Sequence, residues 1–592
     1  MNKELFLSPP DDCRETDLWV LNDRLSDAEL IRQLHSIYSQ GIHSVIVRTF
    51  VGLKSDYPGP EFKRMMHIVV EEAKRLGMTL FMQAGYMPEA VLDLPEEYVL
   101  DQICPFPKGE EEGEIFCTHG KVSYCRVKSQ NILDMMNPEA MKFYLHQSYD
   151  EMWKEFTEEF GKTIAAIWVD EPNFERVLLP WTPGFLRAFE SLWGNVFPKE
   201  KIWLLFEDGP GDEKLRYRFH RTVLYLMQEG YFRCTSDWSK KTKVMFSGHL
   251  MAEDTMWGQI RAGVFTMPCY QYMSIPGIDF LEAALNFQYG EIRPPYEEDF
   301  HWRHFAAYNT PIQCASAAHQ NGQEKVLCEI CGVSTENLNL RDQKTLFDHF
   351  LAMGINHRTL HGLFYSLGGR GKRLYPPHIQ DYQPYWPLYH HLTDAVARES
   401  WFLRQGEPVR DTVLIHPMDS AFCLYRCGSD NSGRIRRYDI RFNETLRALV
   451  AMHENFELGD EDSIASKGFA GKEGFGIGKM TYKNVILPYM LNIRNSTLQL
   501  LKRYISSGGN VIVLGNYPDR MDGEEAADSI CSLLAGANFA KDHTELERQL
   551  AETKHSYIFE SDDDGSGVEI QYREDGEDRL IFLTDADRHM TH

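Results

Sequence analysis

The sequence predicts a mixed α/β protein: a (β/α)8 barrel, then a smaller open α/β domain, then the start of a β-rich segment. Three observations predict this order. Up to about residue 370, short apolar runs alternate with amphipathic helical stretches and form eight strand-then-helix units. Beyond the Pro- and aromatic-rich residues 375–386, strands and helices still alternate, in a smaller set. From about residue 556 the pattern becomes that of β hairpins.

The chain of 592 residues is too long for one hydrophobic core. We therefore expect three parts: the barrel over residues 1–390, the open α/β domain over residues 391–550 and the β-rich segment over residues 551–592. The last segment stops without a clear end, so we expect it to be incomplete.

Composition and charge exclude several classes of protein. The formal net charge of −25 argues against nucleic acid as a partner, because phosphate binding needs basic patches. The N-terminus lacks an apolar signal region, and no stretch has the apolar length of a membrane span. The 12 cysteines are scattered without paired zinc motifs. We expect a soluble, cytoplasmic protein that contacts neither membrane nor nucleic acid.

The first three barrel strands are short apolar runs separated by helices. The first helix opens with a predicted capping box at Ser26, and the second fills residues 60–76 before a closing Gly77. The second strand ends in Arg48. A long stretch, residues 85–136, is predicted to be a loop at the face where barrels carry their active sites. The three strands are residues 18–21, 44–47 and 79–82.

The fourth strand is the most informative stretch of the chain. Residues 164–169 are continuously apolar, as expected of a strand buried on both faces in a parallel sheet. The run ends abruptly in Asp170, Glu171 and Pro172. Strands of α/β barrels present catalytic groups at their C-terminal ends in this way.

The remaining strands also end in polar or aromatic side chains. The fifth leads to His249, the sixth to Tyr270 and the eighth to His361, while the seventh contains Glu329 within its apolar run. Cys328 and Cys331 flank Glu329, but a single C-x2-C pair is more typical of buried thiols than of a metal site. The predicted strands are residues 243–246, 263–267, 325–332 and 358–361.

Two carboxylates at equivalent positions of the predicted barrel indicate a catalytic site. A lone strand-end glutamate is more often a helix cap or an ion-pair partner. Glu171 and Glu329, however, occupy equivalent positions of a repeated βα pattern, and we expect them to face each other across one pocket. Two carboxyl groups placed like this can cleave a glycosidic bond, one giving a proton and the other attacking or activating water.

The second domain shows no comparable constellation. Residues 411–415 and 484–487 are predicted strands, and the Gly508–Gly509 turn precedes its strand, unlike a nucleotide-binding fingerprint. A cluster of acidic residues is predicted to be a solvated loop. These are Glu457, Asp460 and Asp462.

The order of barrel, glutamine-amidotransferase-like α/β domain and β domain resembles the family 42 β-galactosidases of glycoside hydrolase clan A. The resemblance implies that Glu171 is the acid/base and Glu329 the nucleophile, with Arg48 and Tyr270 in contact with the nucleophile. Asp170 stands where the clan usually has an asparagine that binds the sugar 2-hydroxyl. The relatives also imply a homo-oligomer, with a trimer as first choice.

Other stretches resemble a looser group that includes relatives of the family 106 α-L-rhamnosidases and the family 164 β-mannosidases. These are residues 247–253, 275–279 and 383–386.

Several further residues are candidates for substrate binding or catalysis, and each also has a structural interpretation. His249 and His361 could bind sugar hydroxyls or serve as structural strand-end histidines. Trp386 could stack on a sugar or pack on the barrel rim. Glu253 and Asp279 lie in loops, where solvated or capping acids are commoner than catalytic ones.

We therefore predict a retaining, exo-acting glycoside hydrolase that removes a terminal sugar, a β-galactoside or a related one, from small oligosaccharides or glycosides. This chemistry implies no metal ion and no organic cofactor. Two alternatives remain: an inverting, α-L-rhamnosidase-like hydrolase that uses the same carboxylates, and a non-catalytic carbohydrate-binding barrel.

Overall fold

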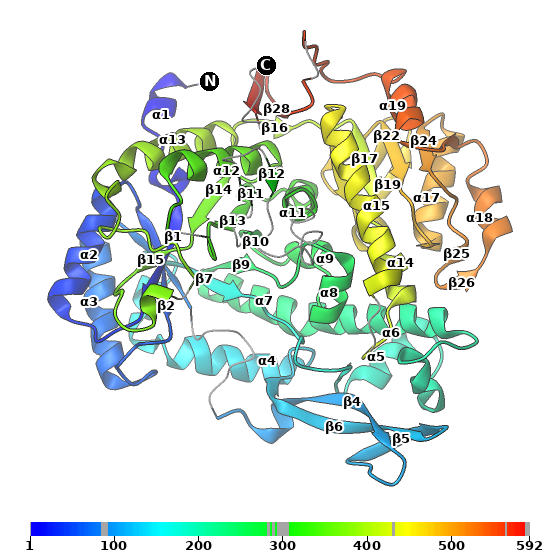
Figure 1. Cartoon of the computed structure of the whole chain (residues 1–592), viewed down its shortest axis with the longest axis horizontal. Coiled ribbons are helices and arrows are strands. Elements are labelled where there is room, and N and C mark those ends of the chain that lie inside the picture. Colours follow the sequence, from blue (N-terminus) through cyan, green and yellow to red (C-terminus); the bar gives the residue numbers. More distant parts are fainter. Residues whose placement is uncertain are drawn as a thin grey trace.

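The computed structural model describes residues 2–83, 93–280, 285–286, 291–292, 307–334, 336–373, 375–428, 432–562 and 565–585. Its first part is a barrel of eight parallel strands surrounded by helices (Figure 1). The strands are β1 (Thr16–Leu21), β2 (Ser44–Thr49), β3 (Thr79–Met82), β7 (Ile164–Asp170), β9 (Met245–His249), β10 (Gly277–Phe280), β13 (Leu327–Ile330) and β14 (His357–Leu360).

The barrel consists of two hydrogen-bonded arcs. One has the order β15-β1-β2-β3-β7-β9, where β15 (Leu363–Phe364) extends the eighth strand, and the other has the order β10-β13-β14. A parallel bridge between Ser247 and Ile275 joins the arcs on one side. On the other side, the amide of Leu360 donates a 2.8 Å hydrogen bond to Asp17. The predicted (β/α)8 barrel is therefore confirmed.

The sequence accounts for these strands through burial. Strands β1 and β2 are buried at every residue, as are the last five residues of β7. Continuous apolar runs of this kind stabilise strands covered on both faces. Helix α3 (Pro60–Leu76) begins and ends as the sequence predicts. It has a proline in its first turn, and Gly77 after its end is in the left-handed conformation.

Helices cover the outside of the barrel. At the N-terminus of α2, Ser26 is the N-cap residue, but its side chain makes no capping hydrogen bond in the described part of the chain, so the predicted capping box is not formed. The main covering helices are α2 (Asp27–Ser39), α3, α4 (Pro138–Leu145), α6 (Asp212–Met227), α7 (Arg233–Thr242), α11 (Asn309–Asn321), α12 (Leu340–Ala352) and α13 (Tyr389–Phe402).

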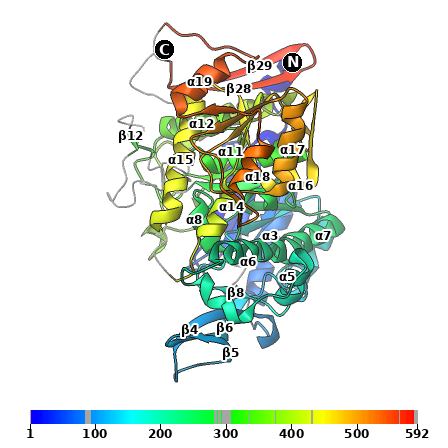
Figure 2. The same cartoon turned by 90° about the vertical axis from the view of Figure 1, so that its right-hand side faces the viewer.

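The predicted long loop after the third strand is instead largely an antiparallel sheet, which projects from the barrel (Figure 2). Its strand order is β5-β6-β4-β8. The prediction failed because much of this sheet faces solvent: β5 has no buried residue, so the apolar alternation is weak. Prolines and acidic residues also interrupt the pattern. The strands are β4 (Val99–Pro107), β5 (Glu114–His119), β6 (Val122–Leu133) and β8 (Pro180–Trp181).

The sixth barrel strand is not residues 263–267. Gly263 ends helix α8 (Met256–Ala262) in a left-handed conformation, and the apolar residues after it lead into the short helix α9 (Met267–Tyr270). The strand is β10, which lies just after Pro276. Its run of four residues was hidden by the neighbouring proline and glycine, which are usual in turns.

The second domain is an open parallel sheet with the order β18-β17-β22-β24-β27, as the sequence predicted. Helices α15 (Ser432–Ala451) and α17 (Asn495–Ser506) belong to it, and it lies beside the barrel (Figure 1). The strands are β17 (Thr412–Ile415), β18 (Phe456–Gly459), β22 (Asn484–Leu487), β24 (Asn510–Leu514) and β27 (Asn538–Ala540).

The acidic residues predicted to form a solvated loop in this domain are largely buried. Glu457 accepts hydrogen bonds from His319 of barrel helix α11 at 2.5 Å and from the Tyr482 hydroxyl at 2.6 Å. Asp460 is fully buried at the start of a helix, and Asp462 pairs with Arg221 of α6 at 2.7 Å. Glu457 and Asp462 therefore join the second domain to the barrel.

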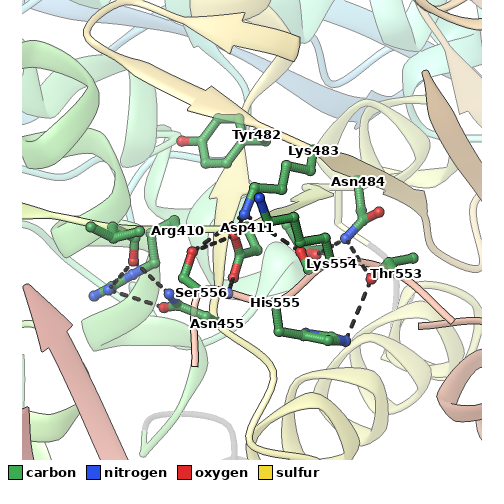
Figure 3. Close-up of polar contacts among 12 residues, drawn as sticks. Arg410, Asp411, Asn455, Tyr482, Lys483, Asn484, Thr553, Lys554, His555 and Ser556 are labelled. Atoms are coloured by element: carbon green, nitrogen blue, oxygen red, sulfur yellow. Dashed lines mark hydrogen bonds and ion pairs between the residues drawn. The ribbon is translucent and has the colours of Figure 1, made fainter. Parts of the chain in front are cut away.

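Another buried acid ties the chain after helix α19 (His543–Ala551) to this sheet. Asp411, just before β17, accepts hydrogen bonds from the amide and the hydroxyl of Ser556, each at 2.7 Å (Figure 3). Lys483 donates to the same carboxylate at 2.5 Å. The connection to the last segment is therefore fixed at the entrance of β17.

The described C-terminal residues form the hairpin β28 (Val568–Asp575) and β29 (Asp578–Asp585), which pairs with β16 (Glu407–Pro408). Glu569 of β28 pairs with His349 of barrel helix α12 at 2.8 Å. The predicted β-rich segment is thus present and packs on the barrel. Among the described residues, no helix combines the length and the apolar character that crossing a membrane requires.

Candidate active site

Four neighbouring strands bring ionisable side chains to the C-terminal mouth of the barrel. Asp170 ends β7 directly beside His249, which ends β9. Asp279 of β10 lies directly beside Glu329 of β13. Glu171 follows β7 by one residue. Because the strands are parallel, these five side chains emerge at one end of the barrel.

His249 lies at the centre of this cluster. Its Nε2 atom is 2.9 Å from Oε2 of Glu329 and 3.5 Å from Oδ1 of Asp170. The histidine side chain is 1% exposed, so water screens these contacts little. One imidazole therefore joins the carboxylates of two different strands.

The predicted strand-two arginine also reaches the cluster. Arg48 donates to Oδ2 of Asp170 at 2.6 Å, and both side chains are almost fully buried. Gln83, which follows β3, donates to the same oxygen at 3.2 Å. Asp170 is thus held by polar groups from three neighbouring strands, an arrangement that fixes its orientation. Arg48 thus bonds to Asp170, and its positive charge also acts on Glu329, while His249 hydrogen-bonds to Glu329.

Glu171 has the properties of a general acid. Burial raises its pKa to about 7, and the nearby carboxylates of Asp170 and Glu329 also raise it. Its backbone lies in the left-handed region with a φ of 52°, which is uncommon for a side-chain-bearing residue. The side chain of Asn173 donates to the Glu171 carbonyl oxygen at 2.7 Å and supports this turn. Glu171 is therefore partly protonated near neutral pH.

Glu329 has the opposite character. Burial alone would raise its pKa, but the positive charge and hydrogen bond of His249 hold the pKa below its usual value. For His249, burial would lower the pKa, yet the carboxylates of Asp279 and Glu329 hold it well above its usual value. An ionised Glu329 beside a protonated His249 is the stable pair.

Asp279 was expected to be a solvated or capping acid, but it lies in strand β10 within the cluster. It lies with Glu171 and His249 in a group whose ligand atoms are all within 4.8 Å of one another. Burial raises its pKa well above the usual range, as does the charge of Glu329. A signal was available, because Asp279 interrupts a short apolar run as Glu329 does.

Glu253 was likewise expected to be solvated, and it is buried behind the cluster. It accepts hydrogen bonds from the amide of Asp279 at 2.9 Å and from the hydroxyl of Tyr270 at 2.8 Å. Burial raises its pKa to about 7. Glu253 therefore supports the strand that carries Asp279.

Two predicted substrate contacts lie elsewhere. Tyr270 is fully buried in α9, and its hydroxyl donates to Glu253, so it does not orient Glu329. Trp386 is also buried: its indole donates to Ser36 of α2 at 3.0 Å and stacks on Tyr389 of α13. It packs between outer helices and presents no face to a sugar.

His361 follows β14 and lies near Glu329, whose charge acts on it. Burial lowers the pKa of His361 to about 4, so the ring is neutral near pH 7. Its Nδ1 atom is buried without a hydrogen-bond partner among the described residues. A neutral imidazole of this kind can exchange a hydrogen bond with a substrate hydroxyl.

Glu171, His249 and Asp279 could also hold a cation, since each offers one ligand atom. Two carboxylates and an imidazole are suitable ligands for a divalent metal. Metal binding would require a neutral imidazole, whereas the surrounding carboxylates favour its protonated form. A metal at this position would therefore compete with a proton on His249.

Comparison with known proteins shows similarity of the fold. No family model matches the sequence. No curated protein matches it either.

Solved structures do resemble the chain. A rhamnosidase from Novosphingobium sp. PP1Y aligns over 98% of this chain and 78% of its own, with 13% identity and a TM-score of 0.72. A β-galactosidase from Marinomonas ef1 aligns over 96% of this chain and 95% of its own, with 12% identity and a TM-score of 0.60. A GH42 β-galactosidase from G. stearothermophilus aligns over 86% and 73%, with 11% identity and a TM-score of 0.56. The predicted resemblance to these two groups is confirmed for the fold.

Proposed function

We propose that the protein is a glycoside hydrolase in which Glu171 is the general acid/base and Glu329 the nucleophile. The observation that supports this proposal best is that the pKa values of the two carboxyl groups are shifted in opposite directions. The pKa of Glu171 is raised to about 7, while His249 holds that of Glu329 below its usual value. Two carboxyl groups whose environments push their pKa values apart are the mark of an acid paired with a nucleophile.

In the first step, the Glu329 carboxylate attacks the anomeric carbon. The bond from that carbon to the leaving oxygen breaks, and Glu171 gives its proton to the oxygen. The product is a glycosyl ester of Glu329. His249 hydrogen-bonds to the carboxylate before the attack and so fixes the orientation of the attacking group.

In the second step, Glu171 is ionised and takes a proton from water. The water oxygen attacks the anomeric carbon, and the ester bond to Glu329 breaks, which releases the sugar and restores both groups. Arg48 and Gln83 keep Asp170 in place next to Glu171, where it can accept hydrogen bonds from sugar hydroxyls. The configuration at the anomeric carbon is retained.

For the substrate, we propose a terminal β-galactoside or a related sugar, in line with the two β-galactosidases of the same fold. The second candidate is an α-L-rhamnoside, because the rhamnosidase superposes with a higher TM-score of 0.72. That enzyme type would use the same carboxyl groups with inversion, and a third acid such as Asp279 could take part.

The experiment is a panel of aryl galactosides, mannosides, rhamnosides and arabinosides incubated with the purified protein. The anomer released first is recorded by proton NMR. Turnover of a β-galactoside with retention supports the proposal, and turnover of an α-L-rhamnoside with inversion supports the second candidate. If no glycoside is hydrolysed, the proposed function is wrong.

We also propose a cytoplasmic location and a homo-oligomer, with a trimer as first choice. All 12 cysteines are unpaired, which is usual in a reducing compartment. The second domain makes buried contacts with the barrel and contributes no residue of the cluster described above, and assembly is the role that we propose for it. Light scattering tests the assembly, and a monomer mass at micromolar concentration would contradict it.

A further inference from the structure

Two aromatic rings stand at the mouth of the barrel beside the cluster of carboxylates. Phe50 directly follows β2, and Tyr375 lies in the loop that follows β14 and β15. Loops that follow parallel strands leave the barrel at its C-terminal face, so both residues lie on the side of the candidate active site. Their ring centroids are 5.9 Å apart with an interplanar angle of 68°.

The exposure and the backbone conformation of Tyr375 are both energetically unfavourable. Its side chain is 40% exposed, so much of a large ring faces water. Its backbone has a φ of 50°, in the left-handed region that costs a side-chain-bearing residue roughly 1 kcal/mol or more. Backbone strain of this kind is found mainly at active sites and ligand-binding sites.

Both rings contact residues of the active site. The Arg48 guanidinium, which bonds to Asp170, lies 5.3 Å from the centroid of the Phe50 ring. The His361 ring lies 6.2 Å from the centroid of Tyr375. Phe50 and Tyr375 therefore lie next to Arg48 and His361, toward the mouth of the barrel.

We propose that Tyr375, supported edge-on by Phe50, is the stacking surface for a pyranose ring of the substrate. The inference rests on the proposed function and adds a specificity-determining residue to it. A pyranose presents a face of C–H bonds whose slight positive charge complements the electron-rich face of an aromatic ring. The tyrosine ring has few rotatable bonds, so ordering it on the sugar costs little conformational entropy.

This surface gives a size and shape preference to the site. A substrate with a pyranose ring that can lie flat on Tyr375 gains contact area, whereas a substrate that places a flexible chain there does not. The polar hydroxyls of the sugar edge remain free to reach His361 and Asp170.

The test measures binding and turnover separately. Tyr375→Ala and Tyr375→Phe are compared with a control, Tyr225→Ala, which removes a tyrosine of similar exposure (38%) on helix α6. Binding of the sugar product and of an uncleaved glycoside is measured by saturation-transfer NMR titration in the Glu329→Gln background. Thermal unfolding confirms that each variant is folded.

We expect Tyr375→Ala to weaken sugar binding roughly 2- to 10-fold, the range of one aromatic contact, and to raise KM with little change in kcat. Tyr375→Phe and Tyr225→Ala should bind like the parent. If Tyr375→Ala binds sugar like the parent while the native enzyme hydrolyses glycosides, the stacking inference is overturned and the proposed function stands. If the native protein neither binds nor hydrolyses any glycoside, both are overturned.

Discussion

The Nε2 atom of His249 lies 2.9 Å from Oε2 of Glu329, and the two side chains are 1% and 3% exposed. This contact joins the fifth and seventh strands of the barrel. It also determines the charge of the candidate nucleophile, because burial alone would raise the pKa of Glu329 and His249 reverses that effect. Each of the predictions about catalysis below depends on this pair or on Glu171.

Replacing His249 should impair activity most at acidic pH. His249→Gln removes the positive charge that lowers the pKa of Glu329, so the pKa of the carboxyl group rises and the ionised form is lost at a higher pH. The acidic limb of the kcat/KM profile should therefore move to higher pH. The profile is measured from pH 4 to pH 9 on an aryl glycoside.

The control is His453→Gln, because His453 lies in the second domain, where its Nε2 atom is 3.2 Å from the carbonyl oxygen of Gly565. This variant should leave the acidic limb where it is. An equal shift in both variants, or none in His249→Gln, would contradict the electrostatic role of His249.

The basic limb of the same profile should report Glu171. Its pKa is raised to about 7, chiefly by burial, and a general acid must be protonated to act. Activity should thus fall as pH rises through about 7. Glu171→Gln should lower kcat and remove this basic limb, whereas Glu175→Gln, four residues further along the chain, should keep it. A basic limb that persists in Glu171→Gln would assign the acid to another group.

The leaving group should decide how much activity Glu171→Ala retains. Leaving groups with very low pKa values need no proton, so their glycosides should still form the glycosyl ester, while poor leaving groups should fail. Added azide should accelerate release of the ester and give a glycosyl azide of retained configuration. Equal loss on all leaving groups, without rescue by azide, would argue against Glu171 as the acid/base.

The contact between the domains should matter for stability. Glu457→Ala leaves His319 and Tyr482 without the carboxylate that both of them contact, and breaking a buried pair costs about 3–5 kcal/mol. Urea unfolding followed by tryptophan fluorescence measures the loss. Glu473→Ala, at an exposed turn of the same domain, should change stability by less than about 0.5 kcal/mol. Similar unfolding midpoints for both variants would show that the contact contributes nothing.

Much of the barrel could be predicted because most of its strands are recognisable as apolar runs in the sequence. The apolar runs of β2 and β7 are long enough to be recognised, and each is closed by a charged residue. Strand β10 begins at Gly277, directly after Pro276, so the local pattern favoured a turn. In the prediction, the apolar residues 263–267, which lead into helix α9, took its place.

The candidate site was predicted in part for the same reason. Glu171 and Glu329 follow or interrupt recognisable strands, so their place could be inferred. Asp279 belongs to the missed strand, and its proximity to Glu171 depends on how the two arcs of the barrel close. The burial of Trp386 against Ser36 is a contact between residues 350 apart, which no local pattern contains.

The most direct test of the account is the turnover number of Glu329→Gln on the most reactive aryl glycoside of the panel. The substitution keeps the size of the side chain and removes the attacking charge. We expect kcat to fall at least about 10³-fold, while Glu324→Gln, an exposed residue before the same strand, stays close to the native rate. A Glu329→Gln variant that retains the native rate within about tenfold would contradict the assignment of Glu329 as the nucleophile.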